Sequence, residues 1–305
     1  MGIENNMRVL VTGVNGQLGH DVMFELLKRG HEAIGSDIGD GYNYDIENNR
    51  YYKLDITNEI AIKTTISQIN PDAIIHCAAW TAVDLAEEDD KRDIVYAVNV
   101  RGTYNIVNVA KDIDAKMIYI STDYVFNGNG QTPWVPDCTN FSPLNYYGQT
   151  KLEGELAVST ILEKYFIVRI SWAFGLNGKN FINTIINVGK THNTVYVVYD
   201  QVGTPTYTLD LSKLLIDMME TSKYGYYHAT NGGGYISWYD FCVEIYKQYG
   251  LKTKVIPVRT EEFFLSKAAR PHNSRLDKSK LVEAGFKPLP TWQDAVKRYL
   301  EEAHL

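Results

Sequence analysis

A tyrosine and a lysine four residues apart, Tyr147 and Lys151, are the residues of this sequence whose types and spacing best suit chemistry. In a helix, side chains at this spacing lie on one face with their Cβ atoms roughly 5–6 Å apart. A cationic amine beside a phenol favours the phenolate and lowers a tyrosine pKa that starts near about 10. The pair therefore predicts a proton donor or acceptor that works near neutral pH. The alternative is a chance match on a surface helix, because the chain has 22 Tyr.

A glycine-rich turn near the N-terminus predicts a dinucleotide site. Residues 7–12 form a short apolar run that is typical of a buried parallel strand. Gly13-x-x-Gly16-x-x-Gly19 follows, and then apolar residues recur at helical spacing. Glycines between a strand and a helix let the backbone approach a pyrophosphate that lies at the helix N-terminus. The spacing differs from G-x-G-x-x-G, but the physical requirement is the same.

Acidic residues at the ends of the next two predicted strands suit the adenosine half of such a cofactor. Asp37 ends the predicted strand at 31–37, where a carboxylate can bind the ribose hydroxyls. It would repel a 2′-phosphate, and no Arg or Lys follows it closely, so NADH is favoured over NADPH. Asp55 and Ile56 end the following strand and could hold the adenine edge.

The fourth and fifth predicted strands end in residues that suit the reacting half of the site. The fourth, residues 72–80, carries Ala78 and Ala79, whose small side chains leave room for a nicotinamide or simply pack closely. The fifth, residues 116–126, carries Thr122 near its carboxyl end, and ligands bind outside the carboxyl ends of parallel strands. Thr122 and the Tyr-Lys pair would form a hydrogen-bonding trio around a carbonyl group.

The alternation of strands and helices predicts an α/β fold with a Rossmann-type, doubly wound parallel sheet. One long helix is expected over residues 83–111 within this pattern. Short strands and helices mix after residue 175, which predicts a smaller C-terminal α+β part for the substrate. We therefore expect a dinucleotide-binding domain over 1–175 and a smaller, partly interleaved domain over 176–305.

A basic loop in the second part could bind a diphosphate. Arg270, His272 and Arg275 lie close together in a chain whose formal net charge is −7. Guanidinium groups fit phosphate oxygens well. The alternative is a solvated basic loop.

Composition argues against several other classes of protein. The acidic balance, with a pI near 5.5, provides no general basic surface for nucleic acid. The three cysteines, Cys77, Cys138 and Cys242, are widely spaced and form no C-x-x-C, so neither a disulfide framework nor a metal site is expected. Residues 1–6 do not resemble a secretory signal, and no apolar run is long enough to span a membrane. A cytoplasmic location is expected.

The glycine turn, Ser121-Thr122 and Tyr147-x-x-x-Lys151 together resemble the extended short-chain dehydrogenase/reductase family. Within that family the sequence is similar to the dTDP-4-dehydrorhamnose reductases. The similar segments occur in order along the whole chain: 16–19, 78–84, 121–126, 143–151, 170–172, 200–206 and 270–276.

The resemblance implies that the chain reduces the C4 ketone of dTDP-4-dehydro-6-deoxy-L-mannose to dTDP-L-rhamnose with NAD(P)H, the last step of dTDP-rhamnose biosynthesis. Tyr147 would protonate the alkoxide, Lys151 would lower the tyrosine pKa and bind the nicotinamide ribose, and Thr122 would donate a further hydrogen bond. The implied cofactor ligands are Gly13, Gly16, Gln17, Leu18, Gly19, Asp37, Asp55, Ile56, Ala78, Ala79, Tyr147 and Lys151. The implied sugar-nucleotide ligands are Thr122, Asp123, Trp172, Arg270, His272 and Arg275, with Trp172 stacking on the sugar.

Differences from related families narrow the range of reactions that the sequence could support. Tyr124 follows Asp123 where the sugar 4,6-dehydratases carry a glutamate base, so elimination is disfavoured. Trp80 stands where the reductases often carry His. Asp21 stands where bacterial members that dimerise around Mg²⁺ use Glu, so we expect no bound metal, and a monomer or a plain homodimer. Two alternatives remain: another nucleotide-sugar reductase or epimerase, and a non-catalytic regulatory subunit like the β subunit of methionine adenosyltransferase.

Overall fold

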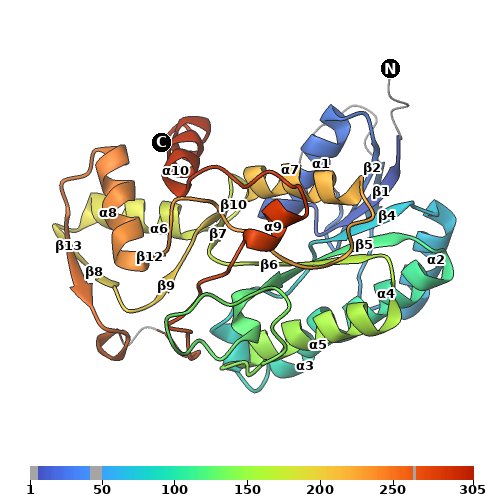
Figure 1. Cartoon of the computed structure of the whole chain (residues 1–305), viewed down its shortest axis with the longest axis horizontal. Helices are drawn as coiled ribbons and strands as arrows, with labels where there is room; N and C mark the ends of the chain where they lie inside the picture. Colours follow the sequence, from blue (N-terminus) through green and yellow to red (C-terminus); the bar gives the residue numbers. More distant parts are fainter. Residues whose placement is uncertain (1–5, 42–49, 264–265) are drawn as a thin grey trace.

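The computed structural model describes residues 6–41, 50–263 and 266–305. Figure 1 shows a central sheet between two layers of helices, and a smaller part that contains α6, α8 and α10 beside it. The C-terminus lies in the smaller part of the molecule.

The central sheet has seven strands in the order β11-β6-β5-β4-β1-β2-β3, and every neighbouring pair is parallel. The strands are β1 (Arg8–Thr12), β2 (Glu32–Asp37), β3 (Arg50–Lys53), β4 (Ala73–His76), β5 (Lys116–Thr122), β6 (Tyr165–Ile170) and β11 (Gly225–His228). The strand order reverses between β1 and β4, which creates a crevice at the carboxyl ends of the strands. The predicted doubly wound, Rossmann-type sheet is confirmed.

Helices cover both faces of the sheet because successive strand residues point to opposite sides. Val9 and Val11 of β1 pack in the core beneath α1 (Gln17–Lys28) and α7 (Thr208–Met219). Leu10 packs in the opposite core, which α2 (Glu59–Ile69), α4 (Gly102–Asp112) and α5 (Tyr146–Ile161) cover. Both cores anchor the strand ends from which the site is built.

The prediction of one continuous helix over 83–111 is wrong. The segment divides into η1 (Leu85–Glu87), α3 (Arg92–Tyr96), the π-helical turn η2 (Ala97–Arg101) and α4. The π turn includes Asn99, whose side chain accepts from Trp80 N at 2.8 Å and donates to Trp80 O at 3.2 Å. π turns of this kind are frequent at functional sites.

The smaller part has its own hydrophobic core. The core lies among α6 (Phe181–Thr191), α8 (Trp238–Tyr249), α10 (Trp292–Glu302) and the parallel pair β8 (Thr194–Val198) and β13 (Lys254–Val258). The remaining elements are η3 (Asp123–Val125), β7 (Ala173–Phe174), β9 (Val202–Gly203), β10 (Thr206–Tyr207), β12 (Ile236–Ser237), η4 (Thr260–Glu262) and α9 (Ser279–Glu283). Both β11 and α7 follow residue 175 but belong to the central sheet and its helices. Because segments on both sides of residue 175 share this core, the domain boundary at that residue stays a prediction.

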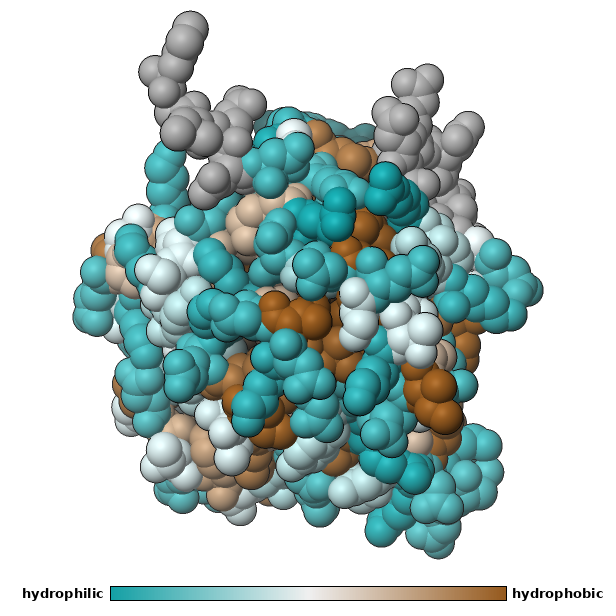
Figure 2. All heavy atoms as spheres, turned by 90° about the vertical axis from the view of Figure 1, so that its right-hand side faces the viewer, coloured by the Kyte–Doolittle hydropathy of each residue, from teal (hydrophilic) through white to brown (hydrophobic). Residues whose placement is uncertain are grey.

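A helix that crosses a membrane must be both long and apolar. Among residues 6–41, 50–263 and 266–305, no helix combines the length and the apolar character that a crossing requires. On the face drawn in Figure 2, apolar side chains are interspersed among hydrophilic ones.

Candidate active site

The start of α5 is fixed by two side chains of the first part of the chain and by a backbone carbonyl of the second. Asn145 caps the helix, because its Oδ1 accepts from Gly148 N at 2.8 Å. Its Nδ2 donates to Ala269 O at 2.8 Å. Glu87 Oε1 accepts from Tyr146 N at 2.7 Å. Tyr147 therefore occupies the first turn of α5, next to residues of the second part.

Lys151 lies one turn further along α5, and its side chain is buried. Its ammonium nitrogen is 4.1 Å from the centroid of the Tyr119 ring on β5. Burial lowers the pKa of Lys151 to about 7, although the charge of Glu155 acts in the opposite direction. Lys151 is therefore only partly charged at neutral pH.

The pKa of Tyr147 is raised, not lowered. Burial is the largest cause, followed by the charge of Asp123 and by Tyr124, and the hydrogen bond to Thr122 acts against them. The expectation that Lys151 lowers this pKa is not met, because burial favours the neutral form of both the phenol and the amine. Tyr147 is accordingly a phenol, the form that donates a proton.

Thr122 and Asp123 lie where β5 ends and the short helix η3 begins. The Thr122 hydroxyl caps η3 by accepting from Tyr124 N at 3.2 Å, and it donates to Asp123 Oδ1 at 3.1 Å. Asp123 is buried, and burial raises its pKa to about 7 despite hydrogen bonds from Ser274 and Thr122. These contacts bring Thr122 and Tyr147 together, as the trio requires.

A cavity of about 230 Å³ at the strand ends contains most of the predicted cofactor ligands. Those that line it are Gly13, Gly16, Asp37, Asp55, Ile56, Ala78 and Ala79. Cys77, at the end of β4, also lines it, and the charge of Lys151 acts on the Cys77 thiol. The amine of Lys151 is thus close to the inner end of this cavity.

The glycine turn is shaped for close backbone approach. A Cβ on Gly13, which has φ +72°, would lie 2.6 Å from Ala78 N, and one on Gly19 would lie 2.2 Å from Gly13 O. Gly16 is the N-cap of α1 and supplies no side-chain acceptor, so the first N–H groups of the helix remain available to an anion. Gln17 and Leu18 begin that helix. This geometry fits the pyrophosphate of a dinucleotide.

Residues 177–179 of the second part lie against this turn. Asn177 Nδ2 donates to Asn15 O at 2.8 Å, and Gln17 Nε2 donates to Lys179 O at 3.2 Å. Asp37 faces the turn from β2, where its Oδ2 accepts from Asn15 N at 3.0 Å and its Oδ1 from Ile38 N at 2.7 Å. A carboxylate is therefore held rigidly at the adenosine end of the cavity.

A second, larger cavity of about 900 Å³ lies in the smaller part of the molecule. It is lined mainly by apolar and aromatic side chains of α6, β8 and α8, and by residues 266–270. Trp238 lines it and stacks on Trp172 with ring centroids 3.9 Å apart. Trp172 has φ +50°, which is unusual for a bulky residue and costs on the order of 1–3 kcal/mol.

Only one of the three predicted basic ligands lines the larger cavity. Arg270 does, and its guanidinium donates to Asp84 at 2.6 Å and to Tyr124 Oη at 3.0 Å. Arg275 donates instead to Asn273 Oδ1 at 3.0 Å. His272 and Arg275 do not line either cavity, so their role as diphosphate ligands stays a prediction.

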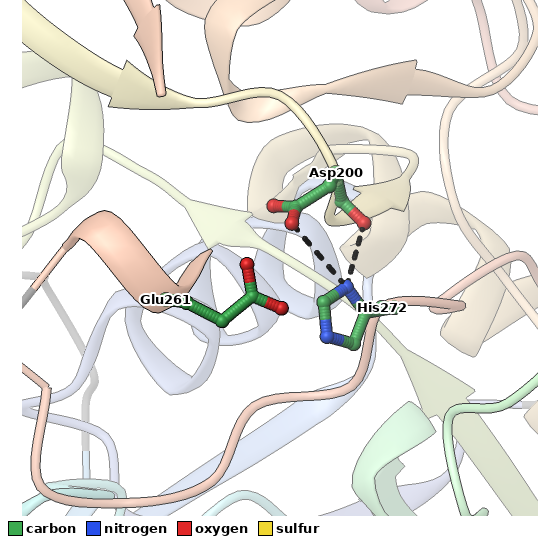
Figure 3. A group of neighbouring side chains, drawn as sticks. All are labelled: Asp200, Glu261 and His272. Carbon is green, nitrogen blue, oxygen red and sulfur yellow. Dashed lines mark hydrogen bonds and ion pairs between the residues drawn. The ribbon is translucent and has the colours of Figure 1, made fainter. Parts of the chain in front are cut away.

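His272 faces two acidic residues, as Figure 3 shows. Its Nδ1 is 3.1 Å from Asp200 O and 3.7 Å from Asp200 Oδ2, and Glu261 lies beside them. One ligand atom from each of the three residues lies within 4.8 Å of the others, as in a site for a metal ion. The Asp200 carboxylate already accepts from Thr260 N and Oγ1, which holds it independently of any ion.

Several residues that position the site were not predicted. Asn145 precedes the predicted helix directly, so its capping role could have been read from the sequence. Trp238, Tyr124 and Asp84 carry no such local signal, because their partners lie far away in the chain.

The predicted trio lines neither of these two cavities but is linked to residues of both. The charge of Lys151 acts to lower the pKa of the Cys77 thiol, and Cys77 lines the smaller cavity. The ring of Tyr147 contacts the ring of Tyr124 edge-on, with centroids 5.8 Å apart, and Tyr124 accepts from Arg270 of the larger cavity.

Comparisons with known proteins agree with this geometry. Residues 7–305 match the family described as RmlD substrate binding domain. The dTDP-4-dehydrorhamnose reductase of Aggregatibacter actinomycetemcomitans is 35% identical to this chain, covering 95% of it and 97% of that protein. The spore coat polysaccharide biosynthesis protein SpsK of Bacillus subtilis is 34% identical, and the match covers 97% of each chain.

The crystal structure of dTDP-4-dehydrorhamnose reductase from Bacillus anthracis in complex with NADP is similar in fold, with a TM-score of 0.88. It is 38% identical in sequence, and the match covers 97% of this chain and 99% of that one. This chain belongs to the RmlD family of the extended short-chain dehydrogenases/reductases, the family of the dTDP-4-dehydrorhamnose reductases.

Proposed function

We propose that this protein reduces the C4 ketone of dTDP-4-dehydro-6-deoxy-L-mannose to give dTDP-L-rhamnose. The observation that carries the proposal is the position of the trio beside two cavities: the smaller one, which the glycine turn and Asp37 line, and the larger apolar one, which Arg270 lines. When bound, NAD(P)H supplies the hydride. Gly13, Gly16, Gln17, Leu18, Gly19 and the other predicted ligands of the smaller cavity would hold it.

The proton comes from Tyr147. Its raised pKa keeps the phenol protonated at neutral pH, so it can donate to the alkoxide that forms from the ketone. The Thr122 hydroxyl, which donates its one proton to Asp123 Oδ1 in this structure, would turn that proton to the same oxygen when the sugar binds. Lys151, whose charge acts on Cys77 of the smaller cavity, would hold the nicotinamide ribose. Trp172, stacked on Trp238 beside the larger cavity, would contact the sugar.

Tyr124 supports reduction over elimination. A dehydratase needs a base at this position, but Tyr124 is a phenol whose oxygen accepts from Arg270 at 3.0 Å. Burial is the main cause that raises the pKa of Tyr124 to about 12. A neutral phenol cannot remove a proton from carbon, so Tyr124 favours a simple ketone reductase.

The preferred cofactor is NADH. The Asp37 carboxylate, fixed by two backbone N–H groups, can accept from ribose hydroxyls and would repel a 2′-phosphate. The Bacillus anthracis relative was crystallised in complex with NADP. The two proteins would therefore differ in their preferred cofactor. We also place the protein in the cytoplasm, without nucleic-acid partners, as a monomer or homodimer that needs no metal.

A coupled assay tests the activity. The purified protein is given the dTDP-4-keto sugar, and oxidation of NADH or NADPH is followed by absorbance. Oxidation that depends on the sugar, with dTDP-L-rhamnose as the product, is expected. No oxidation with either cofactor would refute the proposal, and oxidation only with a keto sugar on another nucleotide would favour the alternative reductase.

A further inference from the structure

Asp84 holds the loop that forms one wall of the larger cavity. Its Oδ1 accepts from Ser266 Oγ at 3.1 Å and from the backbone N–H groups of Lys267 and Ala268, both at 3.0 Å. Its Oδ2 accepts from Arg270 Nη2 at 2.6 Å. The four donors lie within residues 266–270, all of which line the cavity. One carboxylate thus binds the whole wall segment.

The same stretch of chain also fixes the catalytic helix. Glu87 accepts from the first N–H of α5, at Tyr146. Glu88 pairs with Lys267 at 2.6 Å. Residues 84–88 therefore connect the start of α5, which carries Tyr147, with the cavity wall.

The pKa of Asp84 indicates that the carboxylate is ionised. Burial acts to raise it, but the hydrogen bond from Ala268 N, the charge of Arg270 and the Ser266 hydroxyl outweigh burial, and the pKa lies below its usual value. Hydrogen bonds to an ionised acceptor are stronger than neutral ones. Loss of this charge would weaken all four contacts at once.

The Arg270 guanidinium is held by three hydrogen bonds and still has N–H donors for a ligand. A guanidinium has five N–H donors. One donates to Ser266 Oγ at 2.9 Å, one to Tyr124 Oη and one to Asp84. With these contacts among the described residues, two N–H donors remain for the oxygens of a ligand. A fixed guanidinium loses little side-chain entropy when it binds a diphosphate.

We propose that Asp84 is a positioning residue for the nucleotide sugar, which it serves by fixing residues 266–270 and orienting Arg270 at the edge of the larger cavity. The proposal rests on the proposed function in one respect, that this cavity takes the dTDP part of the substrate. Asp84 touches neither the ketone nor the hydride donor in this scheme. Its removal should weaken substrate binding and leave the chemical step largely intact.

The experiment measures dTDP binding by isothermal titration calorimetry and then steady-state kinetics with the keto sugar. Asp84→Asn should weaken dTDP binding by about tenfold, because the partly exposed carboxylate accepts four hydrogen bonds and loses the charge that strengthens all of them. KM for the sugar should rise by a similar factor, while kcat and KM for the cofactor stay within about threefold. Asp89→Asn, at an exposed acidic residue that pairs with Arg92 and not with residues 266–270, is the matched control and should leave dTDP affinity unchanged.

A double-mutant cycle with Arg270→Gln tests the route of the effect. If Asp84 acts mainly by orienting Arg270, Asp84→Asn should cost much less dTDP affinity in the Arg270→Gln background. An equal loss in both backgrounds, or dTDP affinity unchanged in Asp84→Asn, would overturn the proposal. Ser266→Ala, which removes one contact to each of Asp84 and Arg270 without a change of charge, should give a smaller loss in the same direction and serves if Asp84→Asn folds poorly.

The two proposals fail differently. If the wild-type protein binds dTDP but does not reduce the keto sugar, the proposed function is wrong and the positioning role of Asp84 can still be measured. If the wild-type protein does not bind dTDP, the assignment of the cavity is wrong, and the role of Asp84 falls with it.

Discussion

The amine of Lys151 lies 4.1 Å from the centre of the Tyr119 ring, so the lysine of the predicted pair packs against β5 as well as lying near Tyr147. Tyr119 is buried beneath it and donates to Lys151 O at 3.3 Å. Contact with an aromatic face stabilises a cation, but it does not replace the water that burial removes. The pKa of Lys151 therefore falls to about 7.

This burial predicts that Lys151 lowers the stability of the protein at acidic pH. The folded pKa, about 7, lies below the ordinary value of 10.5. Between these values the unfolded chain binds more protons, so stability rises with pH, and below about pH 7 the cost of the buried charge is fully present. Lys151→Met should therefore be more stable than the wild type at pH 6, by at least about 1 kcal/mol, since one pKa unit corresponds to about 1.4 kcal/mol.

Urea unfolding at pH 6 and pH 9 measures this effect. The stability gain of Lys151→Met should shrink at pH 9. Lys63→Met, at an exposed position of α2, controls for the general loss of a charge. A variant that is less stable than the wild type at pH 6 would show that Lys151 is not buried with this cost.

Tyr147→Phe should abolish most of the activity and leave cofactor binding intact. The change removes only the hydroxyl, and general acid catalysis typically contributes about 10²–10⁴-fold. We expect kcat to fall by at least about 10²-fold, while the affinity for NADH, measured by fluorescence titration, stays near the wild-type value. Tyr146→Phe is the matched control, because the Tyr146 hydroxyl lies on the exposed side and makes only a 3.5 Å contact with Arg92 O. Equal turnover in the two variants would remove Tyr147 from the role of acid.

Local sequence patterns predicted the parts of the site that depend on neighbours in the chain. Gly13 and Asp37 could be identified because strand, turn, helix and terminal acid follow one another within a short segment. The bond between Asp84 and Arg270 spans 186 residues, and no local pattern indicates it. The pKa values of Tyr147 and Lys151 were also out of reach, because spacing gives proximity, whereas burial follows from the tertiary packing of β5 and α5.

Asp37→Asn should shift the cofactor preference towards NADPH. The variant loses a charged acceptor for the ribose hydroxyls, a hydrogen bond worth about 1.5–3 kcal/mol, and it loses the repulsion of a 2′-phosphate. The ratio of kcat/KM for NADH to that for NADPH should fall by at least about tenfold. Asp40→Asn, which changes an exposed residue paired with Lys53, should leave the ratio unchanged. A wild type that already prefers NADPH strongly would contradict the role given to Asp37.

Glu155→Gln should destabilise the whole fold. Glu155 and Arg169 form a fully buried, bidentate pair with distances of 2.8 and 2.7 Å, and their side chains are 0% and 1% exposed. The variant leaves the Arg169 charge buried with a neutral partner, and breaking such a pair costs about 3–5 kcal/mol. The contacts of Arg169 with Pro136 O and with the rings of Phe126, Phe141 and Tyr226 cannot supply the missing negative charge.

The same substitution connects stability with the site, because Glu155 lies one turn after Lys151 on α5 and its charge raises the pKa of that lysine. In Glu155→Gln the pKa of Lys151 should fall further, so any loss of activity that comes from an uncharged lysine should begin at lower pH. Urea unfolding measures the first effect and the pH dependence of kcat the second. Glu153→Gln, at a neighbouring position of the same helix, is the control for both. A loss of unfolding free energy below about 1 kcal/mol, the range of surface pairs, would mean that the buried pair contributes no more than an exposed one.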